Sequence, residues 1–147
     1  MIKTSNSVTI MKPVEEVFGY TGDLSNDPAW HTDILAARQT SAGPIGEGTT
    51  FHIRFKPFMG QSEGDVTVTG YEPSSMIQYQ GTMGPMRPTI SYRFEPGSPG
   101  TVVVTRQVEM QPTGWMRLME PIMKMMMGGQ NAQFLQNLKQ VLEKSPS

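Results

Sequence analysis

Residues 115–144 read WMRLMEPIMKMMMGGQNAQFLQNLKQVLEK, and here the apolar side chains change their period. They recur every three or four positions, which predicts one long helix of about 45 Å. Two apolar stripes run along it, one over the whole segment and one ending at Gly128-Gly129. The glycine pair and Pro121 are expected to kink the helix, unless Pro121 begins it after a separate turn. The first stripe contains Met116, Met119, Met123, Met127, Phe134, Leu138 and Val141, and the second contains Trp115, Leu118, Ile122 and Met126.

Before this helix, apolar and polar residues alternate, which is typical of strands with one buried face. In TTFHIRFK, residues 49–56, Phe51, Ile53 and Phe55 fall on one face and His52 on the other. Turns rich in Gly and Pro separate such segments at intervals of about ten residues, which favours an antiparallel meander. Strands are expected at residues 2–11, 34–41, 49–56, 64–71, 76–82, 88–95 and 101–110.

Two short helices are expected after the first strand. Pro13 suits the first turn of one helix, and Ser25 or Asn26 can cap the next, ahead of Pro28. The long helix is the only element able to cover the apolar face of the sheet. The sequence therefore predicts an α+β fold in which a curved antiparallel sheet of about seven strands surrounds a long C-terminal helix.

Four segments resemble the SRPBCC superfamily, also called the START-like or birch-pollen-allergen-like helix-grip proteins, and in particular its polyketide cyclase/dehydrase branch. They are VTIMKPVEEVF at 8–18, DLSNDPAWH at 23–31, PIGEGTTF at 44–51 and FLQNLKQVLE at 134–143. The resemblance implies a single domain over residues 1–144, with a disordered tail at 145–147. It also implies a cavity between sheet and helix that takes a lipid, acyl or polycyclic aromatic ligand. The superfamily includes carriers, receptors and enzymes, so the likeness is specific for fold rather than function.

Composition excludes several classes of function. The 147 residues include 13 Met, no Cys and two His, and the net charge is -1. Disulfides and Cys-ligated metals are therefore absent, and a metal site is not expected. We expect no nucleic-acid partner, because basic residues do not cluster, and no cofactor. No apolar run is long enough to span a membrane or to form a secretory signal, so we expect a cytoplasmic protein without integral membrane association.

The apolar strand faces and the methionine stripe are the expected lining of the cavity. The methionines are either a wall that adapts to a ligand or ordinary core packing. Trp30, which follows the second short helix, is either a packing anchor or a ligand contact. Expected ligand-binding residues are Trp30, Phe51, Ile53, Phe55, Val68, Tyr79, Tyr92, Phe94, Val104, Arg106, Met119, Met123 and Met127.

Arg106 breaks the apolar alternation of its strand. Alternation turns it inward with Val102 and Val104, where it could hold a carboxylate, phenolate or carbonyl oxygen beside the hydroxyls of Tyr79 and Tyr92. Alternatively, a β-bulge turns it outward or it lies in solvent at the sheet rim. His31 is either a general base at the cavity mouth or an exposed residue at the end of a helix.

Three functions fit these patterns. The first is binding of a small hydrophobic molecule. The second is a polyketide cyclase/dehydrase-like enzyme that uses the same cavity, with Arg106, Tyr92, Tyr79 and His31 as catalytic candidates. The third is a partner-binding protein or homodimer that uses the Met/Trp face of the last helix.

Overall fold

The computed structural model describes residues 2–58, 60–84, 86–111 and 114–144. The expected tail at 145–147 and Met59 lie outside these residues, and the side chains of Trp115 and Met116 lie outside the described part of the chain. The elements in chain order are β1 (Ile2–Ile10), α1 (Val14–Gly22), η1 (Leu24–Ala29), β2 (Ile34–Gln39), β3 (Thr50–Phe58), β4 (Gln61–Glu72), β5 (Met76–Thr82), β6 (Thr89–Pro96), β7 (Val102–Met110), η2 (Gly114–Met119) and α2 (Glu120–Lys144).

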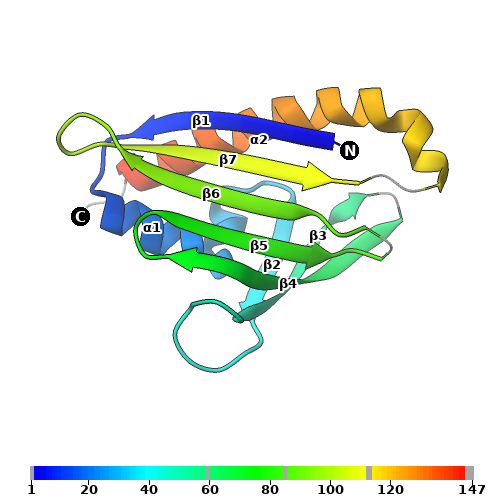
Figure 1. The fold of residues 1–147 in the computed structure, drawn as a ribbon, viewed down its shortest axis with the longest axis horizontal. Helices are drawn as coiled ribbons and strands as arrows, with labels where there is room; N and C mark the ends of the chain where they lie inside the picture. Colours follow the sequence, from blue (N-terminus) through cyan, green and yellow to red (C-terminus); the bar gives the residue numbers. More distant parts are fainter. Residues whose placement is uncertain (1, 59, 85, 112–113, 145–147) are drawn as a thin grey trace.

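The seven strands form one antiparallel sheet in the order β1-β7-β6-β5-β4-β3-β2. Register shifts occur in β2, β3 and β4, and such irregularities bend a strand and increase its twist. Figure 1 shows the resulting curved sheet, with α2 running alongside β1 on its inner side. The expected α+β fold with two short helices after the first strand is confirmed.

The long helix begins later than the apolar period suggested. Residues Gly114–Met119 form a separate 3₁₀ turn, and α2 begins at Glu120, with Pro121 in its first turn. Proline has no N–H to donate and suits the first turn, where that N–H has no partner in the helix. Of the two readings of Pro121, the helix start is therefore correct. The helix then continues through Gly128-Gly129.

Two apolar clusters fill the space between sheet and α2. In the larger one, Phe18, Leu24 and Trp30 from the region of the short helices pack against the strands and against Leu135, Leu138 and Leu142 of α2. The smaller one joins Ile2, Met86, Met110 and Met123 near the start of α2. Between these two clusters lies the part of the inner face that carries polar groups.

Candidate functional site

A cavity of about 180 Å³ lies between the inner face of the sheet and α2. Its walls are mainly apolar, and its polar members come from β1, β3, β7, α2 and the segment after η1. Lys56 and Gln130 are exposed, whereas Thr4, His31, Arg106 and Asn131 are buried. The lining residues are Thr4, His31, Asp33, Ile34, Ile53, Phe55, Lys56, Met83, Pro88, Ile90, Arg106, Val108, Met110, Met127, Gln130, Asn131 and Phe134.

Arg106 faces into this cavity. The strand β7 pairs with β1 and with β6 in unbroken register on both sides, so no bulge turns its side chains over. Arg106 therefore shares the inner face with Val104 and Val108 and is only 6% exposed. The alternatives of an outward or rim position are wrong.

Three neutral groups surround the Arg106 guanidinium. Its Nε donates to the Tyr92 hydroxyl at 3.0 Å, one terminal nitrogen donates to Asn131 Oδ1, and the other lies 3.4 Å from His31 Nε2. A guanidinium has five N–H groups, so two have no assigned acceptor among the described residues. No carboxylate of these residues forms an ion pair with Arg106.

His31 is buried beneath α2, so its expected position at an exposed helix end is wrong. The backbone N–H of His31 donates to the Asp27 carbonyl at 2.7 Å, and this bond turns the chain inward after η1. The ring stacks on Phe134 at 3.8 Å between centroids. Burial, and then the neighbouring Arg106 charge, hold the pKa of His31 well below its usual range. The ring is therefore neutral, with Nε2 free to accept from Arg106 and the proton assigned to Nδ1.

The two tyrosines have different positions. Tyr92 accepts from Arg106, and burial raises its pKa to about 12. Tyr79 instead donates to the Gly22 carbonyl at 2.6 Å, and burial raises its pKa as well. Tyr79 thus ties β5 to the end of α1, and its expected role as a partner of Arg106 is not supported by these contacts. Neither phenol ionises near neutral pH.

Three further polar residues belong to this cluster and were missed from the sequence. Asn131 donates to Asn6 Oδ1 at 2.7 Å and to the Arg106 carbonyl at 3.1 Å. Burial raises the pKa of Asp27, although the Arg106 charge opposes the shift. Thr4 lies in the lining of the cavity. Two signals were present: Asn131 continues the buried helical stripe at 127, 134 and 138, and Thr4 has the same parity as the buried Ile2 and Val8.

Only some of the predicted lining reaches the cavity. Tight packing around Phe18, Leu24 and Trp30 fills the inner face near α1 and η1, so strand residues there are closed core. Met119 is 37% exposed and is not part of the lining. Of the predicted ligand-binding residues, the cavity is lined by Ile53, Phe55, Arg106 and Met127, whereas Trp30, Phe51, Val68, Tyr79, Tyr92, Phe94, Val104 and Met123 are packed in the clusters.

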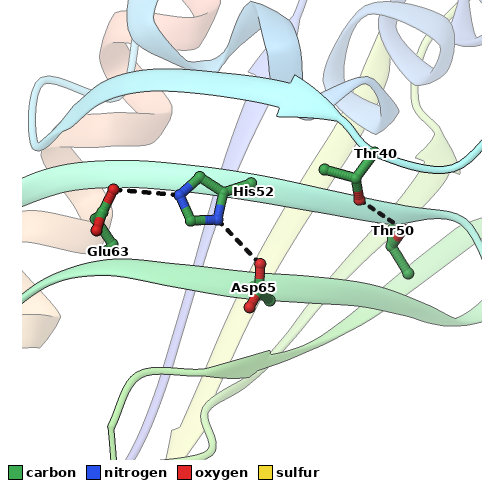
Figure 2. A network of polar contacts seen from close by, with 5 residues as sticks. All are labelled: Thr40, Thr50, His52, Glu63 and Asp65. Carbon is green, nitrogen blue, oxygen red and sulfur yellow. Dashed lines mark hydrogen bonds and ion pairs between the residues drawn. The ribbon is translucent and has the colours of Figure 1, made fainter.

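His52 lies on the outer face of the sheet, as the alternation predicts. Figure 2 shows its ring between two carboxylates of β4, with Nδ1 3.0 Å from Asp65 and Nε2 3.3 Å from Glu63. These hydrogen bonds, the one to Asp65 first, raise the pKa of His52. The same face has a shallow polar hollow lined by Ala36, Ala37, Arg38, His52, Arg54 and Glu63. This network is separate from the cavity.

The second apolar stripe of the last helix points away from the core. Leu118 is 85% exposed, and Ile122 and Met126 are about half exposed; the neighbouring Met125 is 76% exposed. The described residues contain no group of three or more His, Asp or Glu side chains placed to hold a metal ion. Nor does any helix in the described part of the chain have the length and apolar character needed to cross a membrane.

A curved antiparallel sheet around a long C-terminal helix, with a cavity between them, defines a helix-grip protein of the START-like class. The chain belongs to the family described as "Polyketide cyclase / dehydrase and lipid transport", whose family model matches residues 1–143. No curated protein matches it in sequence.

Solved structures share this fold at low sequence identity. The di-domain ARO/CYC protein BexL from the BE-7585A biosynthetic pathway has a TM-score of 0.79 at 14% identity; the match covers 99% of this chain and 48% of BexL. This chain therefore spans about half of BexL. A Thermus thermophilus protein (TM-score 0.77, 15% identity) and a START superfamily protein from Mycobacterium smegmatis (0.76, 14%) match over 98% of this chain and 99% of theirs. At these identities the likeness concerns the fold alone.

Proposed function

We propose that this protein binds a small, mainly apolar molecule in the cavity beneath α2, with Arg106 as the main polar contact. The observation that carries the proposal is the buried guanidinium, which faces apolar walls and forms no ion pair with a described carboxylate. A buried charge without a partner is costly. A ligand that brings an electron-rich oxygen to the free N–H groups offsets that cost, while its apolar body is removed from water.

The size of the cavity limits the ligand. A cavity of about 150 Å³ holds a benzene-sized molecule, so the 180 Å³ here suits one or two rings or a short acyl chain. Met83, Met110 and Met127 lie in the wall, and unbranched methionine side chains re-pack readily. Larger lipid, acyl or polycyclic ligands would enter by displacing them. These three methionines support the reading of an adaptable wall. From the stripe of the last helix Met127 contributes to it, whereas Met123 packs in the smaller cluster.

Cyclisation or dehydration in the same cavity is a second candidate, which the family description supports. Buried and neutral, His31 has the protonation state of a general base. Its Nε2 already faces an Arg106 N–H, however, at 3.4 Å. A base needs a free lone pair directed at the proton it removes. His31 would have to leave Arg106 first, so binding is the better supported function.

Isothermal titration calorimetry with 2-naphthalenemethanol tests the binding function. Ile53→Trp fills the cavity from β3 and should weaken binding at least tenfold. Arg54→Trp, the same replacement at the adjacent outward and exposed position, is the matched control and should bind normally. If the native chain binds no such compound, or if Ile53→Trp binds as tightly as the control, the proposal is wrong.

The enzymatic candidate needs its own test. Turnover of a linear poly-β-ketone should fall at least tenfold in Arg106→Gln, because the arginine that is lost would stabilise the developing enolate oxygen. His31→Gln should lower turnover by a larger factor than it weakens binding of 2-naphthalenemethanol. Equal turnover in both variants and the native chain would remove these residues from any catalytic role.

A further inference from the structure

Thr4, which lines the cavity, carries a second buried polar group without a partner among the described residues. The Thr4 side chain is 7% exposed and lines the cavity. Its Oγ1 has no hydrogen-bond partner among the described residues. A buried hydroxyl without a partner destabilises the folded state, so this group gains when a bound molecule supplies one. Thr4 is thus a candidate ligand contact that the apolar pattern of β1 conceals.

Thr4 and Arg106 lie on neighbouring strands and share the inner face. In the β1–β7 ladder Asn6 is opposite Arg106, and Thr4 is opposite Val108. Thr4 and Arg106 are therefore diagonal neighbours, a relation that places Cα atoms roughly 7–8 Å apart. The long arginine side chain shortens the gap between the polar atoms. Since both residues also line the same cavity, we expect one small functional group to reach both of them.

The charge of this region favours an anion. Arg106 is positive, and its assigned partners Tyr92, Asn131 and His31 are neutral. The nearby carboxyl of Asp27 is fully buried, and burial raises its pKa, which favours the uncharged acid. The site is also rich in donors, since two arginine N–H groups, the Thr4 hydroxyl and the His31 Nδ1–H have no partner among the described residues. A ligand that accepts hydrogen bonds and carries negative charge fits both features.

Building on the proposed binding function, we propose that the buried end of the ligand is a carboxylate and that Thr4 selects for it. One carboxylate oxygen accepts from the free Arg106 N–H groups, and the other accepts from the Thr4 hydroxyl. An alcohol or a single carbonyl offers one oxygen, so it leaves one of the two sites unmet. An amine adds positive charge beside Arg106 and is disfavoured.

Calorimetry with a matched pair of compounds tests this inference at pH 7. The pair is 2-naphthoate and 2-naphthalenemethanol, which share their ring system and differ in the group at the buried end. The native protein should bind the acid about tenfold or more tightly than the alcohol, because hydrogen bonds to charged groups are the strong ones. Thr4→Val, which keeps the shape and removes the hydroxyl, should lose about tenfold for the acid only. Thr9→Val, at an exposed position on the same strand, should change neither affinity.

The outcomes separate the two proposals. If neither compound binds the native chain, the binding function itself is wrong. If both bind with equal affinity, the ligand-binding function holds and the carboxylate inference is overturned. If Thr4→Val weakens both compounds equally, or leaves the acid unaffected, Thr4 is a packing residue and not a selective contact.

Thermal unfolding of the ligand-free protein gives an independent measurement. Removing a buried hydroxyl that has no partner should stabilise the fold, so Thr4→Val should raise the melting temperature by about 3 °C. Thr9→Val should leave it unchanged within a degree or so. A lower melting temperature for Thr4→Val would show that the hydroxyl already has a partner within the protein, which would overturn its assignment as a ligand contact.

Discussion

Replacing Asn131 by alanine should destabilise the protein far more than its size suggests. Asn131 is 1% exposed, and its hydrogen bonds join α2 to β7 and β1. Its Oδ1 accepts from the Arg106 guanidinium, and its Nδ2 donates to Asn6 Oδ1 and to the Arg106 carbonyl. Asn131→Ala removes all three hydrogen bonds. Two of the groups that lose their partner, the guanidinium and the backbone carbonyl of Arg106, are buried.

The magnitude follows from these contacts. A hydrogen bond to a charged group contributes about 1.5–3 kcal/mol, and each neutral bond contributes about 1 kcal/mol. Asn6 is half-buried, so water can replace its lost partner. Alanine also favours a helix interior by up to ~0.7 kcal/mol, which offsets part of the loss. The expected decrease in the free energy of unfolding is about 3 kcal/mol.

Urea denaturation followed by circular dichroism measures this loss, and the midpoint should fall by roughly 1–2 M. Asn137→Ala is the matched control on the same helix. Its half-buried side chain donates to the Trp30 carbonyl at 3.1 Å and accepts from the exposed Gln133, so its replacement should cost less than about 1 kcal/mol. If the two variants lose equal stability, the Arg106–Asn131 contact does not carry the energy assigned to it.

Two further expectations concern pH and self-association. The lowered pKa of His31 means that the unfolded chain binds more protons below about pH 6.5, so stability falls on acidification; His31→Gln should flatten that loss in denaturation between pH 5 and 7. The raised pKa of His52 has the opposite sign: its contribution is full below about pH 6.5 and is lost as pH rises through the folded pKa, so His52→Gln should steepen the loss on acidification. A steeper curve for His31→Gln would contradict the first. The homodimer stays a prediction. In analytical ultracentrifugation, Leu118→Lys should shift a dimer toward monomer, whereas the control Gln136→Lys should not. A native chain that is monomeric at every concentration would rule out the homodimer.

Much of the architecture was predictable because it depends on local patterns. Alternation assigned the inner face of most strands. It placed Arg106 on that face too, although a β-bulge or a rim position remained as alternatives. The change of period at the last segment predicted the long helix. Pro121 left two readings because a proline kinks a helix interior and also suits a first turn. The segment before it forms a 3₁₀ turn rather than part of the α-helix, and this decides for the helix start.

The candidate site was harder to predict, and the residues explain why. His31 and Trp30 are neighbours after η1, yet one lines the cavity and the other fills the core. Asn131 and Thr4 are ordinary polar residues in their own segments. Their importance appears only when β1, β7 and α2 bring them to one Arg106 side chain. The spacing of residues within one segment carries no information about which side chains of different segments come into contact.

The sequence by itself determined the apolar face of most strands and the presence of a long C-terminal helix, because side-chain direction follows the local period of the backbone. It left Arg106 between an inward and an outward position, and the unbroken register of β7 decided for the inward one. Only the tertiary structure decided which part of the inner face is solid core and which part is cavity. Both need the same apolar residues, and the difference depends on what distant segments insert between them. Here Phe18, Leu24 and Trp30 close one end of the inner face. Further along, Arg106 and Thr4 face a cavity that side chains do not fill.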